Sequence, residues 1–270
     1  MSGAAALEAD TRRIAARPPL AQRLVGALWR ALPVILVCIA WQIAPSVGLI
    51  NPDALPPLSA VVAAWWGLLM DGSLASNGMT SLYEVVVGLG LSIVVGIGSG
   101  VLMAWYAPVE AIVSPLMKSL YPMPKSALIP VMILWFGLGP NSKIASIFAG
   151  CLLPVVLSSY NGARGVDQTL IWSALGLGAS RRRVLWEVVI PAALPEIMAG
   201  IRNALAISFI LMVAAEFLVG QQGLGYVISF LGDGGVYDAM FAGVLTVSAV
   251  GFLADRVYLV FMQRMLRWRD

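Results

Sequence analysis

Residues 167–195 read DQTLIWSALGLGASRRRVLWEVVIPAALP, the longest segment that lies between the apolar runs of this chain. Asp167 and Ser180 are both residue types that cap the N-terminus of a helix. A Gly-Leu-Gly sequence separates them, and two prolines close the segment. We therefore predict two short helices outside the bilayer, at about 168–175 and 181–189.

The second of these helices begins with the only run of three basic residues in the chain, Arg181–Arg183. Arg183 and Glu187 are four residues apart, so they can pair on one helix face. Clustered arginines also attract anionic lipid headgroups. The residues alone therefore leave two alternatives open: a helix pair gripped by another protein, or a helix pair lying on the inner lipid surface.

The composition is that of an integral membrane protein. Of 270 residues, 60% are hydrophobic and only 11% are charged, and the mean hydropathy is +0.88. A typical soluble domain has about 25% charged residues. Six apolar runs of helical length follow one another, at about 31–50, 82–105, 111–137, 144–159, 197–219 and 239–262. We predict an all-α integral membrane protein with six transmembrane helices.

The basic residues set the expected orientation. Five arginines precede the first apolar run, and basic residues favour the cytoplasmic side. With six spans, Arg181–Arg183 then also lies in the cytoplasm, and Lys143 is the one basic residue clearly outside. We predict that both termini are cytoplasmic, with a tail over 1–30 that is not typical of a cleaved signal. The transmembrane domain is expected over 31–270, with the cytoplasmic segment over 161–195.

Three ionisable residues within or near the apolar runs are candidates for a path across the membrane: Lys125, Glu216 and Lys118. An ionisable residue inside a span is a functional-site hypothesis by default. Lys125 lies nearer to the middle of its run, among four prolines that free backbone carbonyls. Lys118 has the alternative of extending to the inner interface.

Other classes of function find no support in the residues. The chain has no histidine, and its two cysteines, Cys38 and Cys151, lie apart in apolar runs. No G-x-x-x-x-G-K-[ST] loop for nucleotide phosphates occurs. We therefore expect no metal site, no bound cofactor, no nucleic-acid partner and no enzymatic activity.

Small residues recur at four-residue spacing in the second run, at Ser92, Gly96 and Gly100. Such spacing lets two helices approach closely in lipid. The partner helix can belong to the same subunit, or it can belong to a second copy of the chain.

The 167–195 segment resembles the E-A-A-x3-G-x9-I-x-L-P motif of ATP-binding-cassette importer permeases. Trp172, Ser173 and Ala174 occupy the opening triplet, where Trp172 replaces the usual acidic residue. The remaining motif positions are filled by Gly178, Val188, Ile190 and Pro191.

The resemblance extends over about 41–268 and is similar to the nitrate/sulfonate/taurine branch of these permeases. The segments that carry it are LYPMPKSALIPVMILWFGLG (120–139), Ala214–Glu216, Gly223–Tyr226 and Leu266–Arg269. Tyr121 stands where relatives often have a basic residue.

This resemblance implies a permease subunit of the bacterial inner membrane with a MetI-like bundle and cytoplasmic coupling helices. A homodimer would form the path for a small anionic solute such as a sulfonate, taurine or nitrate. Its implied partners are two ATPase subunits, which hydrolyse ATP in its place, and a periplasmic binding protein. The expected ATPase contacts are Trp172, Ser173, Ala174, Leu175, Gly178, Ala179, Arg182 and Pro191. The alternative is a membrane anchor or scaffold that recruits a cytoplasmic partner and transports nothing.

Overall fold

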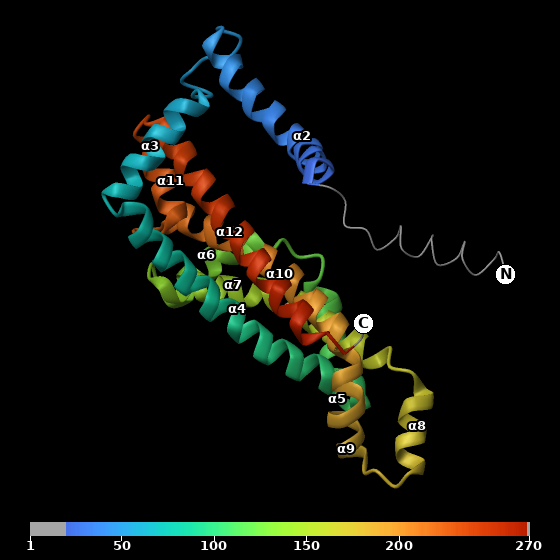
Figure 1. Ribbon diagram of the computed structural model, residues 1–270. Helices are drawn as coiled ribbons and strands as arrows, with labels where there is room; N and C mark the ends of the chain where they lie inside the picture. The colour runs from blue at the N-terminus through green and yellow to red at the C-terminus, as the bar shows by residue number, and fades with distance from the viewer. Residues whose placement is uncertain (1–19, 269–270) are drawn as a thin grey trace, which may run out of the picture. The chain divides into compact units, whose positions relative to one another are not determined.

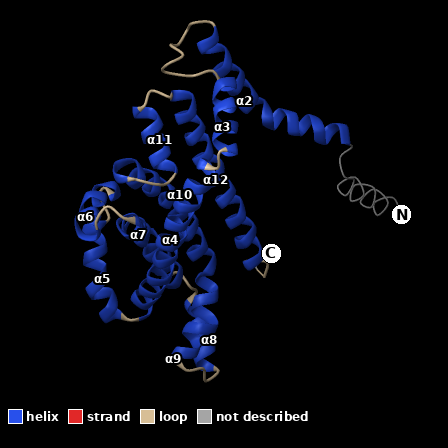
Figure 2. Ribbon diagram, turned by 90° about the vertical axis from the view of Figure 1, so that its left-hand side faces the viewer, coloured by secondary structure: helices blue, strands red, loops and turns tan. Residues whose placement is uncertain are grey.

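The computed structural model describes residues 20–268, and every regular element in that range is a helix (Figures 1 and 2). The predicted all-α class is therefore confirmed. The chain divides into two compact units, residues 1–60 and 61–270.

The first unit contains α2 (Leu20–Ser46) and the turn that follows it. The turn is tied back to the helix, because the Trp41 Nε1–H donates to the Pro56 carbonyl at 2.9 Å. The Ser59 N–H likewise donates to Gln42 Oε1 at 2.9 Å. Because α2 begins at Leu20, the last residues of the predicted 1–30 tail belong to a helix, and the remainder lies outside the described residues.

The second unit holds most of the helices. They are α3 (Leu58–Met70, from Val61 onward), α4 (Ser73–Trp105), α5 (Ala107–Leu120), η1 (Lys125–Ala127), α6 (Leu128–Phe136), α7 (Pro140–Arg164), α8 (Gln168–Gly176), α9 (Arg181–Val184), η2 (Leu185–Val189), α10 (Ile190–Val219), α11 (Leu224–Asp233) and α12 (Tyr237–Met265).

Helix α7 is the centre of this unit, because it packs against both α4 and α10. Buried side chains from all three helices form one core, with Leu89 on α4, Ile147 and Val155 on α7, and Ala204 and Met212 on α10. Most of this core is aliphatic, so the three helices are held by close van der Waals packing.

The small residues of α4 face α7 within the same subunit. A Cβ on Gly100 would lie 2.5 Å from the Val156 carbonyl oxygen, and one on Gly96 would lie 2.8 Å from Val155 Cγ1. The Ser92 hydroxyl donates to the Phe148 carbonyl at 2.9 Å. The sequence left two candidate partner helices for Ser92, Gly96 and Gly100. In the structure these residues contact α7 of the same chain.

The helix after Ser180 differs from the expectation. It runs from Arg181 through Val219 without a break, so the expectation that Pro191 and Pro195 end a short second helix is wrong. The π-helical turn η2 precedes Pro191, and in it the Ile190 N–H donates to the Leu185 carbonyl five residues back. Since proline has no N–H to donate, a locally wider turn accommodates it within the helix.

Four helices in the described part are long and apolar enough to cross a membrane: α4, α7, the helix Arg181–Leu218 and α12. Of the other two predicted spans, the first falls within α2 (Leu20–Ser46), whose part from Ala31 to Ser46 is apolar, and the third is broken into α5, η1 and α6. A straight helical span needs about 20 residues. The count of six therefore stays a prediction.

Substitution of Gly100 by Ala should weaken the α4–α7 contact, because the new methyl group meets the backbone of α7. We expect a loss of about 1–3 kcal/mol in unfolding free energy, measured by thermal unfolding in detergent. Gly98→Ala is the matched control, since no atom lies within 4 Å of the added Cβ. Equal effects of both substitutions would contradict the close approach.

Candidate functional site

Helix α8 has defined signals at both ends. The Asp167 side chain caps its N-terminus, accepting a hydrogen bond from the Thr169 N–H at 2.8 Å. Hydrogen bonds from the Thr169 side chain and backbone also hold the pKa of Asp167 below its ordinary value. Ser180 caps the next helix in the same way, through the Arg183 N–H at 3.3 Å. Both predicted caps are confirmed.

The C-terminus of α8 is a Schellman motif. The Ala179 N–H donates to the Ala174 carbonyl at 3.1 Å, and the Gly178 N–H donates to the Leu175 carbonyl at 2.9 Å. This geometry places Gly178 in the left-handed region, at a φ of +87°. Residues with a Cβ are strained there, which gives a physical reason for a glycine at this position of the motif.

Helices α8 and α9 project from one end of the unit (Figure 1). The outer side of α8 and its turn carries large hydrophobic side chains that contact little of the chain: Leu170, Trp172, Leu175 and Leu177, which we call the α8 apolar patch. Trp172 is 67% exposed and Leu177 is 90% exposed. Apolar groups this exposed on a projecting hairpin are typical of a protein interaction site.

The structure divides the predicted contact residues into two groups. Ala174 and Ala179 point inward and pack on the core formed by Val184, Val189 and their neighbours. They therefore hold α8 against the helix that starts at Arg181. The exposed members are Trp172, Ser173, Leu175, Gly178, Arg182 and Pro191.

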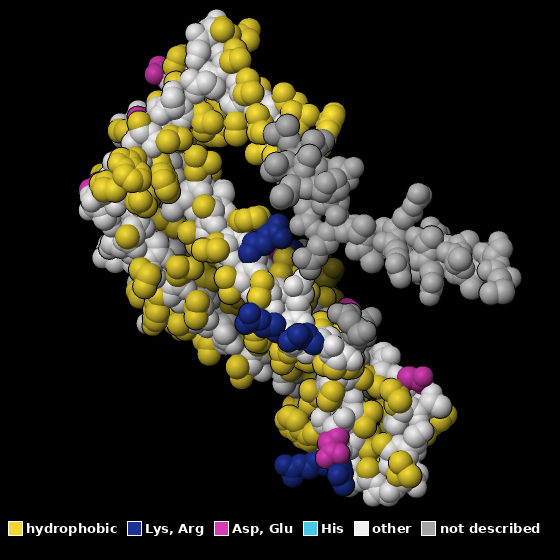
Figure 3. Space-filling model, viewed as in Figure 1, with side chains coloured by type: hydrophobic (Ala, Val, Ile, Leu, Met, Phe, Trp, Pro, Cys, Tyr) yellow, Lys and Arg dark blue, Asp and Glu magenta, His cyan; other side chains and the backbone are white. Residues whose placement is uncertain are grey.

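The arginine run lies at the same end of the molecule. Figure 3 shows basic and acidic side chains together at the α9 end, whereas hydrophobic side chains cover most of the adjoining helices on this face. Arg183 Nε donates to Glu187 Oε2 at 2.8 Å, which confirms the predicted pair. Both side chains are more than half exposed, so the pair contributes little to stability.

Gly178→Ala should loosen the end of α8, because alanine in the left-handed region costs about 1–2 kcal/mol. We expect faster hydrogen exchange of the amides over 174–179. Gly176→Ala provides the control, since Gly176 has no positive φ and no atom within 4 Å of an added Cβ. Unchanged exchange in the Gly178 variant would show that the turn does not depend on glycine.

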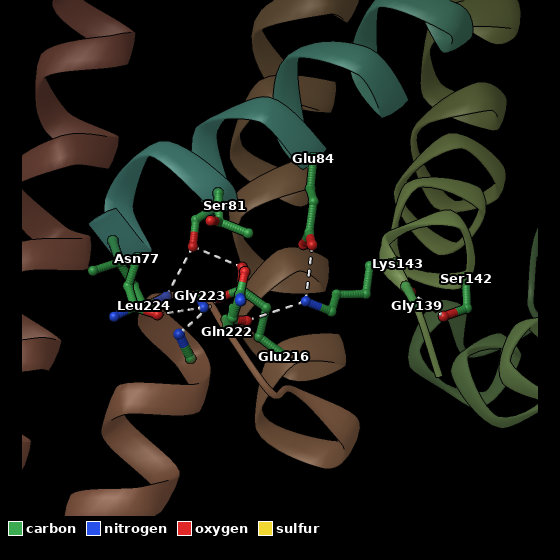
Figure 4. A network of polar contacts seen from close by, with 12 residues as sticks. Asn77, Ser81, Glu84, Gly139, Ser142, Lys143, Glu216, Gln222, Gly223 and Leu224 are labelled. Atoms are coloured by element: carbon green, nitrogen blue, oxygen red, sulfur yellow. Dashed lines mark hydrogen bonds and ion pairs between the residues drawn. The ribbon is translucent and has the colours of Figure 1, made fainter. Parts of the chain in front are cut away.

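Glu216 lies in a second polar site, formed by α4, α7, α10 and the start of α11 (Figure 4). Its side chain is fully buried. Oε1 accepts from the Ser81 hydroxyl at 2.6 Å, and Oε2 accepts from the Gly225 N–H at 2.7 Å. Ser81 Oγ in turn accepts from the Leu224 N–H at 2.8 Å. The carboxylate thus caps the N-terminus of α11, where the helix dipole favours negative charge.

The neighbouring ion pair joins α4 to α7. Lys143 Nζ donates to Glu84 Oε1 at 2.8 Å and to the Gln222 carbonyl at 3.1 Å. Both side chains are buried, at 8% and 0% exposed. The sequence predicts that Lys143 lies on the outer side of the membrane, and this orientation stays a prediction; the structure adds that its ammonium group is buried in this network.

Sequence reasoning missed Ser81 and Glu84 as members of this site. They lie in a polar segment of α4 far from Glu216 along the chain, so neither spacing nor motif connects them. The signal that was present is the pair of motifs Ala214–Glu216 and Gly223–Tyr226. The structure joins these motifs through the Glu216–Gly225 hydrogen bond. A Cβ on Gly223 would lie 2.2 Å from the Glu216 carboxylate, which explains the glycine.

The three path candidates do not form one site. Glu216 belongs to the network just described, and Lys118 is exposed at the end of α5. Lys125 is half-buried beside the middle of α7. A Cβ added to Gly150 of α7 would lie 3.6 Å from the Lys125 Cβ. It lines a cavity of about 420 Å³.

Arg202, a further basic residue near a span end, is paired across helices. Its Nε and Nη2 donate to the two carboxylate oxygens of Asp255 on α12, at 2.7 and 3.0 Å. The two side chains form a bidentate contact, which fixes the orientation of both. Arg202 therefore pairs within the subunit, with a carboxylate 53 residues away along the chain.

Glu216→Gln should destabilise the start of α11, because its amide has one acceptor oxygen and cannot accept from both the Ser81 hydroxyl and the Gly225 N–H. Loss of a buried acceptor costs about 1–3 kcal/mol. The expected result is a lower midpoint of thermal unfolding and faster exchange over 223–228. Glu196→Gln, on the exposed side of the same helix, should change neither quantity. Equal midpoints for the two variants would contradict the capping role.

Comparison with known proteins places these features in a family. Residues 92–267 match the binding-protein-dependent transport system inner membrane component family. The chain is 32% identical to the taurine transport system permease protein TauC of Escherichia coli (strain K12), over 96% of this chain and 94% of that protein. It is 31% identical to the putative aliphatic sulfonates transport permease protein SsuC of Bacillus subtilis (strain 168), over 88% of this chain and 86% of that one.

The fold is also similar to a solved structure. A chain of the MetNI methionine ABC transporter in an inward-facing conformation superposes with a TM-score of 0.63, at 19% identity, covering 73% of this chain and 97% of that chain. At this identity the likeness concerns the fold, which is MetI-like.

The apolar helices and the projecting α8 hairpin define a multi-pass membrane protein of the transporter class. The chain belongs to the binding-protein-dependent transport system inner membrane components, and it is an ABC importer permease of the MetI type. It is not an enzyme, since ATP hydrolysis in such transporters belongs to a separate subunit.

Proposed function

We propose that two copies of this chain form the path by which a small anionic solute crosses the bacterial inner membrane. A periplasmic binding protein delivers the solute, and two ATPase subunits dock on the cytoplasmic side. Residues 31–270 form the transmembrane domain, and both termini are cytoplasmic. The α2 helix and the broken α5–η1–α6 segment supply the two spans beyond the four long helices.

The α8 apolar patch is the observation that carries this proposal. Four large hydrophobic side chains remain exposed on a hairpin that stands apart from the apolar helices (Figure 1). Burying such side chains against a partner stabilises the complex by about 25 cal/mol per Å². The capped ends and the inward Ala174 and Ala179 keep α8 firm, so a movement of the partner is transmitted to the helix that begins at Arg181.

The same hairpin connects the partner to the membrane. Because α9, η2 and α10 form one continuous helix, force applied at Arg181 reaches Val219 and the Glu216 network at the opposite end. This arrangement supports a mechanism in which ATP binding in the partner changes access to the path.

The proposed solute class rests on the relatives and on one side chain. The names of two relatives specify taurine and aliphatic sulfonates, which are both sulfonates. Lys125 supplies a positive charge beside the middle of α7. A cation at that depth offsets the cost of bringing an anion into the membrane.

Trp172→Ala should abolish co-purification of the ATPase subunit while the permease remains in the membrane. Central aromatic side chains at interfaces cost about 2 kcal/mol or more when removed, so we expect at least a tenfold loss of affinity in a pull-down titration. Trp135→Ala on α6 is the matched control, since Trp135 and Trp172 are equally exposed, at 67%.

The outcomes separate this function from the scaffold alternative. Loss of ATPase association together with loss of solute uptake supports the importer. Normal association with no solute accumulation in vesicles supplied with ATP and the binding protein would support a scaffold. If the Trp172 variant still binds the ATPase normally, α8 is not the docking helix.

A further inference from the structure

A cavity of about 420 Å³ lies between α5, the η1–α6 segment, α4 and the middle of α7. Figure 2 shows α6 above α5, and α6 packs against α7. The volume is within the range of about 300–1,000 Å³ that is typical of small-molecule sites. The cavity therefore has room for a small solute.

The cavity contains one charge. Among the residues that line it, Lys125 is the only ionisable one, and no Asp or Glu is present. The Ser99 hydroxyl is already engaged, since it donates to the Val95 carbonyl at 2.7 Å. Lys125 is thus the only polar side chain in the cavity that is free to bind a ligand.

Lys125 differs from the other basic residues that contact the helix bundle. Lys143 pairs with Glu84, Arg164 with Glu110 and Arg202 with Asp255. No hydrogen bond or ion pair to Lys125 occurs in the described part of the chain. A partly buried ammonium group without a partner can attract an anion, and an ionisable residue in an apolar segment is a functional-site hypothesis by default.

The rest of the lining is apolar. Leu116, Met117, Met132, Phe148 and Leu152 form walls on α5, α6 and α7. Methionine side chains adapt to ligands of different shape. These walls suit an alkyl chain, and they offer no carboxylate to an ammonium group on the ligand.

We propose that this cavity binds a monoanion with an unbranched apolar body, its anionic head at Lys125 and its alkyl chain against α5 and α7. This inference rests on the proposed function and narrows its solute class, from sulfonates in general to those without an amino group. A zwitterion would have to bury an ammonium group without a partner, which is unfavourable.

Propane-1-sulfonate and 2-aminoethanesulfonate test this specificity, because they differ only in a terminal methyl or ammonium group. Binding of each labelled compound is measured by equilibrium dialysis, with the permease–ATPase complex in nanodiscs and no binding protein. We expect propane-1-sulfonate to bind at least about tenfold more tightly, which corresponds to about 1.4 kcal/mol.

Two variants test the location. Lys125→Gln should weaken propane-1-sulfonate binding at least about tenfold, whereas Lys118→Gln, which removes an exposed charge from the neighbouring helix, should not. Ala149→Leu fills the cavity without changing its charge and should also abolish binding. Co-purification of the ATPase with each variant shows that the permease is assembled.

Several results would overturn the inference. They are equal binding of the two compounds, no binding of either, or binding that is insensitive to both Lys125→Gln and Ala149→Leu. A co-purified anionic phospholipid that is lost from the Lys125 variant, with no propane-1-sulfonate binding to the wild type, would identify a lipid site. Failure of the ATPase to co-purify with the wild type would instead contradict the proposed function.

Discussion

The close approach of α4 to α7 is the contact on which the rest of the structure depends. In a bilayer, moving an apolar side chain from lipid into a helix contact gains little free energy, because lipid tails are also apolar. Helices therefore associate through close packing and hydrogen bonds. Gly96 and Gly100 let the two backbones meet, and the Ser92 hydroxyl bonds across the contact. With α4 and α7 joined in this way, α10 packs against both of them, and this contact supports the long helix from Arg181 to Val219.

The two ends of that long helix differ in chemistry. Near Arg181, a Schellman turn and two inward alanines hold α8 in place, and large hydrophobic side chains remain exposed. Near Val219, polar groups are buried, and the Glu216 carboxylate holds the start of α11 against α10 by accepting the Gly225 N–H. A continuous helix between the proposed docking surface and the start of α11 fits a transporter whose ATPase is a separate subunit.

The features that followed from sequence are local ones. Asp167 and Ser180 cap helices within two or three residues, and Arg183 pairs with Glu187 one turn away. The expectation that failed depended on the wider fold: Pro191 did not end its helix, because a π-helical turn accommodated it. The burial of Lys143 against Glu84 likewise depends on a carboxylate of another helix. No local sequence pattern indicates either arrangement.

The sequence by itself determined the membrane class, the helix caps, the glycine that ends α8 (Gly178) and the family resemblance. Hydropathy, capping and turn chemistry act over a few residues, so they can be read locally. Only the tertiary structure decided which helix the small residues of α4 contact, which residues surround Glu216, and that Lys125 faces an apolar cavity. These outcomes depend on side chains that are far apart in sequence, and their positions follow from how the helices pack.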